Sequence, residues 1–289
     1  MEQDDLSRRD FVSMTIGAGI AAAGGSELLA QAQVVETTVN IKTPDGTCDA
    51  AFIHPPNGTY PGVIIWPDAF GLRPSLREMG RRLAGSGYSV LVVNPFYRVA
   101  KAPVFEDASN FNFSDPPQRA KLTPLMGSIT AAGAVEKDAP AYVAWLDSQP
   151  QVDETKKIGT QGYCMGGPLV MRTAASVPNR IGAGGSFHGG GLVTNNPDSP
   201  HLLAPKIKAK MYFGVAANDD AQQPDAKTKL KEAFDAAKNP AEIEVYSQSQ
   251  HGWCISDMPK QANGQPIYNK PDADRAWTKL LALYKAGLV

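Results

Sequence analysis

The sequence predicts an α/β protein in which a mostly parallel central sheet carries helices on both faces. After two leading segments rich in β-branched residues, short apolar runs alternate along the chain with segments of helical periodicity. A chain of 289 residues, 43% hydrophobic and 20% charged, is long and apolar enough to form one sizeable core. The formal net charge of -1 supplies no basic field, so we expect no nucleic-acid partner.

Strands are expected where alternating or continuous apolar runs are bounded by turn residues. The first two expected strands alternate and flank a Pro-Asp-Gly turn, and the later ones are short buried runs. The expected strands span residues 34–43, 48–54, 61–67, 88–93, 157–161, 181–187, 210–215 and 241–246.

Helices are expected where apolar residues recur every three or four positions. Over residues 75–83, for example, Leu76, Met79 and Leu83 share one helical face, and two glycines end the pattern. The other expected helices span residues 130–146, 168–175, 226–237 and 273–286. Residues 99–130 are rich in proline and lack a clear period, so they are expected to be irregular, as a candidate lid.

The first 32 residues are expected to be an export signal that does not belong to the fold. Arg8 and Arg9 precede an apolar run over residues 11–23, and an A-x-A pattern ends at Ala32. The arginine pair resembles the twin-arginine (Tat) type of signal, which implies the Tat export machinery as a partner and a periplasmic or secreted protein. The run is too short and glycine-rich for a stable membrane span, although an uncleaved N-terminal anchor is the alternative. The remaining domain is expected to span residues 33–289.

The three cysteines, Cys48, Cys164 and Cys254, leave at least one free thiol in an oxidising compartment. A bridge between Cys48 and Cys254 is possible, but the sequence does not decide it. No C-x-x-C pair or cysteine–histidine spacing indicates a zinc site, and no metal is expected.

The hexapeptide GYCMGG at residues 162–167 carries the strongest functional signal in the chain. It lies between an expected strand and an expected helix that has Pro168 in its first turn. Strand, glycine-rich turn and helix together match the nucleophile elbow of the α/β-hydrolase fold, with cysteine in place of serine. Cys164 is therefore the candidate nucleophile, because a helix N-terminus favours the thiolate. The alternative is a buried structural cysteine in a glycine-rich turn.

The partners of such a nucleophile follow it in the chain as an acid and then a histidine. Asp219 follows the expected strand 210–215, and His251 follows the expected strand 241–246, so both are placed at strand ends. His251 is the candidate base and Asp219 the candidate orienting acid. Asp220 is a rival for the acid, because only one of two adjacent side chains can face the imidazole.

Several further residues are candidates for the site. The backbone N–H groups of Met165 and Ala69 are the expected oxyanion donors, one from the elbow and one from the loop after the third strand. Asp68, at the same strand end, could contact the resting thiol or instead cap the coming turn. His188 follows a strand end near the elbow and could line a substrate pocket.

Four motifs together resemble the dienelactone hydrolase family. They are PDAFGL at 67–72, GYCMGG at 162–167, AND at 217–219 and HGW at 251–253. The resemblance implies an α/β-hydrolase fold, a Cys-His-Asp triad and hydrolysis of dienelactone (carboxymethylenebutenolide). The family often carries glutamate where Asp68 stands. It also uses arginines to bind the substrate carboxylate, which makes Arg98 a candidate, with a surface salt bridge as the alternative role.

The expected chemistry is cleavage of a small-molecule lactone or ester through a thioester on Cys164, with no metal or organic cofactor. Two other functions stay open. One is a broader periplasmic esterase or thioesterase. The other is a non-catalytic protein of the same fold whose thiol binds a partner or senses oxidants.

Overall fold

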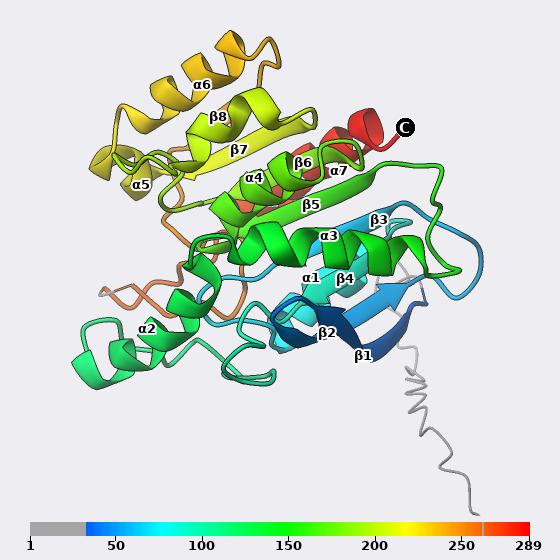
Figure 1. The fold of residues 1–289 in the computed structure, drawn as a ribbon. Coiled ribbons are helices and arrows are strands. Elements are labelled where there is room, and N and C mark those ends of the chain that lie inside the picture. Colours follow the sequence, from blue (N-terminus) through cyan, green and yellow to red (C-terminus); the bar gives the residue numbers. More distant parts are fainter. Residues whose placement is uncertain (1–32, 262) are drawn as a thin grey trace, which may run out of the picture. The chain divides into compact units, whose positions relative to one another are not determined.

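The computed structural model describes residues 33–261 and 263–289, and Figure 1 draws their fold. The predicted export signal, residues 1–32, lies outside the described residues. Within the described part of the chain, no helix combines the length and the apolar character that crossing a membrane requires.

The fold is built on one eight-stranded sheet with the strand order β1-β2-β4-β3-β5-β6-β7-β8. β1 pairs antiparallel with β2, and β2 pairs antiparallel with β4, whereas every other neighbouring pair is parallel. The prediction of a mostly parallel sheet is therefore confirmed. The strands are β1 (Val35–Thr43), β2 (Gly46–His54), β3 (Gly62–Trp66), β4 (Ser89–Val93), β5 (Ile158–Tyr163), β6 (Ile181–Phe187), β7 (Lys210–Ala216) and β8 (Glu242–Tyr246).

Five of the helices lie where the sequence predicts them, and three further helical elements were not expected. The expected ones are α1 (Pro74–Ala84), α3 (Ala134–Asp147), α4 (Gly166–Ser176), α6 (Ala226–Ala236) and α7 (Lys270–Gly287). The unexpected ones are α2 (Pro116–Thr130), α5 (Ala217–Gln222) and a 3-10 helix, η1 (Pro200–Lys206). The segment 99–130 is thus only partly irregular, because α2 forms its second half.

The helices cover both faces of the sheet and enclose two hydrophobic cores (Figure 1). α3 and α4 pack on one face, and α1 and α7 pack on the other. The central strands β3, β4 and β5 are buried along their whole length, as strands with helices on both sides must be. α2 contributes to both cores, with Leu122 in one and Leu125 in the other.

The parallel arrangement brings the predicted site residues to one edge of the sheet. Asp68 follows β3, Cys164 follows β5, His188 follows β6, Asp219 follows β7 and His251 follows β8. Because parallel strands end on the same side, the loops after them meet at a common crevice, where open α/β sheets bind their ligands.

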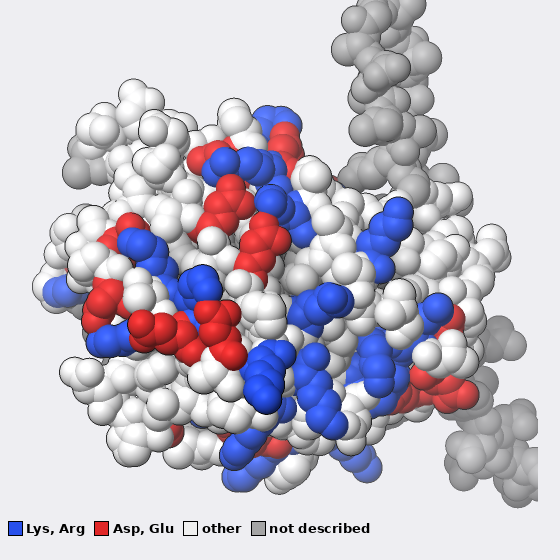
Figure 2. All heavy atoms as spheres, turned by 90° about the horizontal axis from the view of Figure 1, so that it is seen from above, with Lys and Arg blue, Asp and Glu red and all other residues white. Residues whose placement is uncertain are grey.

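The charged side chains on the surface are mixed in sign. Figure 2 shows acidic and basic side chains side by side on the face that it draws. Several are joined in ion pairs, such as Arg82 with Asp274 and Lys279 with Glu242. Cys48, Cys164 and Cys254 are all free thiols, so the disulfide that the sequence allowed is not formed.

Candidate active site

Cys164 occupies a strained turn between β5 and α4. Its φ angle of 53° lies in the left-handed region, which few residues other than glycine adopt. The flanking glycines allow the strand and the helix to approach. A β-carbon on Gly162 would lie 2.1 Å from the carbonyl oxygen of Gly166, and one on Gly166 would lie 2.3 Å from the carbonyl oxygen of Trp66. The Cys164 side chain is only partly buried, as a nucleophile must be.

His251 connects the thiol to a carboxylate. Its Nδ1 lies 2.8 Å from the Oδ2 of Asp219, and Cys164 lies close enough to help raise the pKa of the ring. The backbone N–H of His251 donates to Oδ1 of Asn218 at 2.8 Å, which fixes the loop that carries the imidazole. Asp219 lies in the first turn of α5 rather than in the open turn that the sequence predicted. The rival acid Asp220 faces away and forms an ion pair with Lys227 at 2.5 Å.

The surroundings of His251 favour its protonated form. Burial lowers the pKa of this imidazole, but the hydrogen bonds and charges of Asp219 and Cys164 outweigh burial and raise the pKa to about 10. The site therefore holds an imidazolium at neutral pH.

The contribution of Asp219 to this state can be measured. In Asp219→Asn, the hydrogen bond and the charge that raise the pKa of His251 are lost, so the ring is expected to lose its proton at a lower pH than in the wild type. Histidine ¹⁵N NMR over a pH series reports the titration directly. His201, on η1, has a pKa that burial and then Lys229 lower, and its titration is expected to stay unchanged. An unshifted His251 titration would contradict the role of Asp219.

His188 is a neutral, fully buried imidazole beside both catalytic candidates. Its Nδ1 accepts the backbone N–H of Cys164 at 3.0 Å, so the neutral ring carries its proton on Nε2. Burial, followed by the charge of His251, lowers the pKa of His188 well below its usual value. Its ring lies 4.9 Å from that of His251 in an edge-to-face arrangement. His188 thus holds the elbow through the N–H of Cys164 and packs against the ring of His251.

The two predicted oxyanion donors come from two different loops. Met165 directly follows Cys164, and Ala69 lies in the loop after β3. Ala69 and Met165 are both buried. Neither backbone N–H donates to a protein acceptor within the described residues. Unpaired backbone N–H groups on two buried residues are unusual, since most N–H groups in the interior of folded proteins are paired. They are therefore available to bind an oxygen atom that arrives with a ligand.

Asp68 is engaged by an arginine that the sequence gave no reason to select. Its two carboxylate oxygens accept from Arg73 at 2.7 and 3.0 Å, and Oδ1 also caps the turn by accepting the N–H of Phe70. Arg73 donates with its other edge to Asp257, with both contacts at 2.8 Å. Asp68 thus takes the capping role rather than a contact with the thiol. The fully buried guanidinium ties the loop of Ala69 to the segment that follows His251.

The clamp, by which we mean Arg73 with its two carboxylate partners Asp68 and Asp257, is expected to stabilise the fold. Arg73→Met leaves the buried carboxylate of Asp68 and its partner Asp257 without a cation, which should lower the free energy of unfolding by about 3–5 kcal/mol. Arg81→Met, on helix α1 that Arg73 directly precedes, breaks only partly exposed ion pairs and should cost less than about 1 kcal/mol. Urea unfolding of both variants tests the difference. Equal losses of unfolding free energy in the two variants would show that the clamp stabilises the fold no more than a partly exposed ion pair does.

Arg98, the candidate for binding a substrate carboxylate, is already paired. Its Nη2 lies 2.8 Å from Asp138 and 3.0 Å from Asp45. The Asp138 carboxylate is fully buried on α3 and also accepts from Tyr97, so the guanidinium neutralises a charge inside the protein. Arg98 therefore has the salt-bridge role that the sequence allowed as the alternative.

Comparisons with known proteins agree with the fold and identify the family. The family model for the dienelactone hydrolase family matches residues 48–288. A carboxymethylenebutenolidase from Rhodococcus opacus is 26% identical over 215 residues, which are 73% of this chain and 78% of that protein.

Two solved structures share the fold. A dienelactone hydrolase-like promiscuous phosphotriesterase from metagenomic libraries has a TM-score of 0.71 and 22% identity, covering 89% of this chain and 99% of that one. A dienelactone hydrolase from Anabaena variabilis has a TM-score of 0.59 and 16% identity, covering 89% of this chain and all of that one, 100%. Because the family model spans most of the sequence, this chain belongs to the dienelactone hydrolase family and is a hydrolase.

Proposed function

We propose that the protein hydrolyses a carboxylic ester or lactone through a Cys164–His251–Asp219 triad and a thioester intermediate. One observation carries the proposal. The imidazole of His251 joins a partly exposed thiol to a carboxylate at the edge of the sheet where the parallel strands end. Thiol, imidazole and carboxylate in this order are the parts of nucleophilic acyl transfer.

The first half of the reaction acylates the sulfur. The thiolate of Cys164 attacks the carbonyl carbon, and the carbonyl electrons move to oxygen. The N–H groups of Met165 and Ala69 then stabilise the oxyanion; one such donor is typically worth about 2.7–4 kcal/mol. As the tetrahedral intermediate collapses, the C–O bond breaks. The imidazolium of His251 gives its proton to the leaving oxygen, while Asp219 holds the ring in the required tautomer.

The second half releases the acid. Neutral His251 takes a proton from water as the water oxygen attacks the thioester carbonyl. The C–S bond breaks, the carboxylic acid departs, and the thiolate and imidazolium are restored. No step needs a group beyond the protein and water.

A substrate panel tests this function. The purified protein is expected to hydrolyse p-nitrophenyl acetate and small lactones with turnover, and dienelactone itself belongs on the panel. A broad preference for uncharged esters would favour a general esterase, which the ion pairs of Arg98 support because they occupy the predicted carboxylate-binding cation. A reactive thiol without turnover on any ester or lactone would contradict the proposal and favour a binding or redox-sensing role.

A further inference from the structure

The turn that carries the N–H of Ala69, one of the two expected oxyanion donors, is fixed on both sides of that residue. The carboxylate of Asp68 accepts the N–H of Phe70 at 2.9 Å, and the carbonyl oxygen of Asp68 accepts the N–H of Gly71 at 3.0 Å. The N–H of Ala69 itself donates to no acceptor in the part of the chain that the structure describes. The turn therefore leaves one N–H free and fixes the direction in which it points.

Arg73 holds this turn from inside the protein. Its guanidinium donates to both carboxylate oxygens of Asp68, at 2.7 and 3.0 Å, and to the carbonyl oxygen of Gly71 at 3.3 Å. The side chain is fully buried, and its guanidinium carbon lies 5.3 Å from the centre of the Phe70 ring. A planar guanidinium that binds a carboxylate with two hydrogen bonds imposes a geometry that a lysine ammonium does not. Arg73 thus contacts the turn on both sides of Ala69.

Asp257 anchors the guanidinium at its other edge. Its two carboxylate oxygens accept the Nε and Nη2 hydrogens of Arg73, both at 2.8 Å. Asp257 lies in the loop between β8 and α7, and the side chain of Ile255 in the same loop is fully buried in a hydrophobic core. The turn around Ala69 is therefore tied through Arg73 to a packed part of the protein.

The clamp does not favour an oxyanion through its charge. It combines one cation with two carboxylates, so its net formal charge is negative. Its benefit to catalysis must therefore come from geometry. Backbone donors stabilise an oxyanion when they are aimed at it before the reaction, and a displacement of about 1 Å can cost about 10²-fold in rate.

We propose that Arg73 is a positioning residue for catalysis, which orients the N–H of Ala69 toward the carbonyl oxygen of the substrate. The inference rests on the proposed ester hydrolysis and adds to it a residue that acts only through the oxyanion donor. A weakened clamp should therefore slow ester hydrolysis and leave the thiol of Cys164 as reactive as before.

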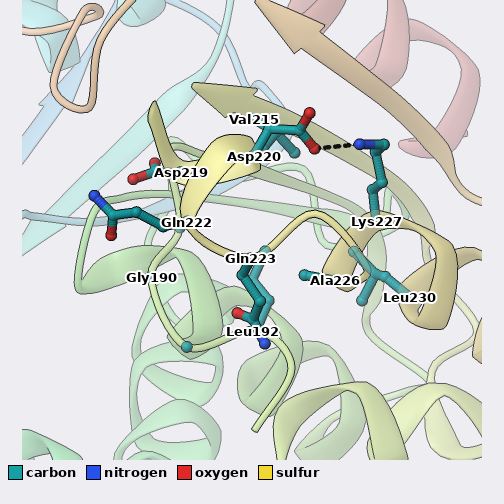
Figure 3. Close-up of a pocket in the computed structure, with 12 residues that line it drawn as sticks. Gly190, Leu192, Val215, Asp219, Asp220, Gln222, Gln223, Ala226, Lys227 and Leu230 are labelled. Carbon is teal, nitrogen blue, oxygen red and sulfur yellow. Dashed lines mark hydrogen bonds and ion pairs between the residues drawn. The ribbon is translucent and has the colours of Figure 1, made fainter. Parts of the chain in front are cut away.

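The base is held by contacts that do not include the clamp. The Nδ1 of His251 contacts Asp219, and the backbone N–H of His251 donates to Asn218, both at 2.8 Å. Both partners belong to α5, and Figure 3 shows Asp219 on this helix, pointing away from the ion pair of Asp220 and Lys227. Alkylation of the thiol needs the thiolate but no oxyanion donor, so it reports on the thiol and the base alone.

Two variants weaken the clamp in different ways. Arg73→Lys keeps the positive charge but loses the fork that binds two carboxylates. Asp257→Ala removes the anchor and makes the clamp formally neutral, so an effect of charge would raise the rate, whereas an effect of orientation lowers it. In both variants we expect kcat/KM for p-nitrophenyl acetate to fall by at least about tenfold. The rate constant for alkylation of Cys164 by iodoacetamide should stay within about threefold of the wild-type value.

Asp45→Ala is the matched control. Asp45 is one of two carboxylates that pair with Arg98, and it lies in the turn between β1 and β2. The variant thus removes one of two partners from another arginine and leaves the turn around Ala69 intact. Its kcat/KM and its alkylation rate constant are expected to match those of the wild type. Circular dichroism shows that each variant is folded, and if Arg73→Lys does not fold, Asp257→Ala decides.

The outcomes separate this inference from the proposed function. If the folded clamp variants hydrolyse the ester with the wild-type kcat/KM, Arg73 does not orient the donor. If alkylation falls in parallel with hydrolysis, the clamp supports the whole site rather than the donor, and the inference is again wrong. In both cases the wild type still hydrolyses esters, and the proposed function stands. A wild type that turns over no ester contradicts the proposed function and, with it, the inference.

Discussion

Replacing Cys164 with alanine is expected to abolish ester hydrolysis, with kcat falling by about 10⁴–10⁶-fold. In the proposed mechanism the sulfur forms the bond to the substrate. His251, held by Asp219, exchanges the protons that this step requires. Steady-state hydrolysis of p-nitrophenyl acetate measures the loss, with circular dichroism to show that the variant is folded.

Cys48→Ala is the matched control. Cys48 is fully buried in β2, its Sγ contacts the carbonyl oxygen of Asn94 at 3.4 Å, and burial raises its pKa to about 12. Such a thiol does not act as a nucleophile at neutral pH. The variant is expected to keep the wild-type kcat even if it unfolds more easily. Equal losses from the two changes would mean that Cys164 has no special part in the reaction.

Asp219→Asn is expected to lower kcat by about 10⁴-fold. An amide cannot stabilise the imidazolium of His251 and favours the wrong tautomer of the neutral ring, as removal of the charge does in other triads. The fold should be little affected, because the side chain is partly exposed and the amide is of similar size. The measurement is again kcat for p-nitrophenyl acetate.

The neighbouring variant Asp220→Asn separates a specific effect from a general change in local charge. It breaks only the partly exposed ion pair with Lys227, so kcat for the acetate ester should change by less than about tenfold. If Asp220→Asn lowered kcat more than Asp219→Asn does, Asp220 rather than Asp219 would be the acid that orients His251.

The sequence was sufficient for the sheet and the elbow because both leave strong local patterns. Strands buried on both faces, such as β3 and β4, must be continuous apolar runs, and their bounds were predicted to within a residue or so. The elbow is readable because glycine is required at Gly162 and Gly166, where any side chain would collide with backbone atoms. The placement of Asp219 and His251 followed from chain order and strand ends, since parallel strands finish on one side.

The missed features depend on neighbours distant in the sequence. α2 contains Pro124 in its interior and begins at a proline pair, which conceals it from a search for helical periodicity. α2 is stabilised by tertiary packing, because Leu122 and Leu125 are buried in the two cores. Arg73 and Asp257 are 184 positions apart in the sequence, so no local sequence pattern predicts their pairing. The sequence therefore left open whether Asp68 contacts the thiol or caps the turn, and its pairing with Arg73 could not be predicted.

The most direct measurement is mass spectrometry of the protein quenched in acid during turnover of p-nitrophenyl acetate. The account predicts one acetyl group on the peptide that contains Cys164, formed in the wild type and removed by hydroxylamine, and accumulating in a variant slowed at deacylation. Turnover with an unmodified Cys164, or an acetyl group carried only by another residue, would contradict the thioester mechanism.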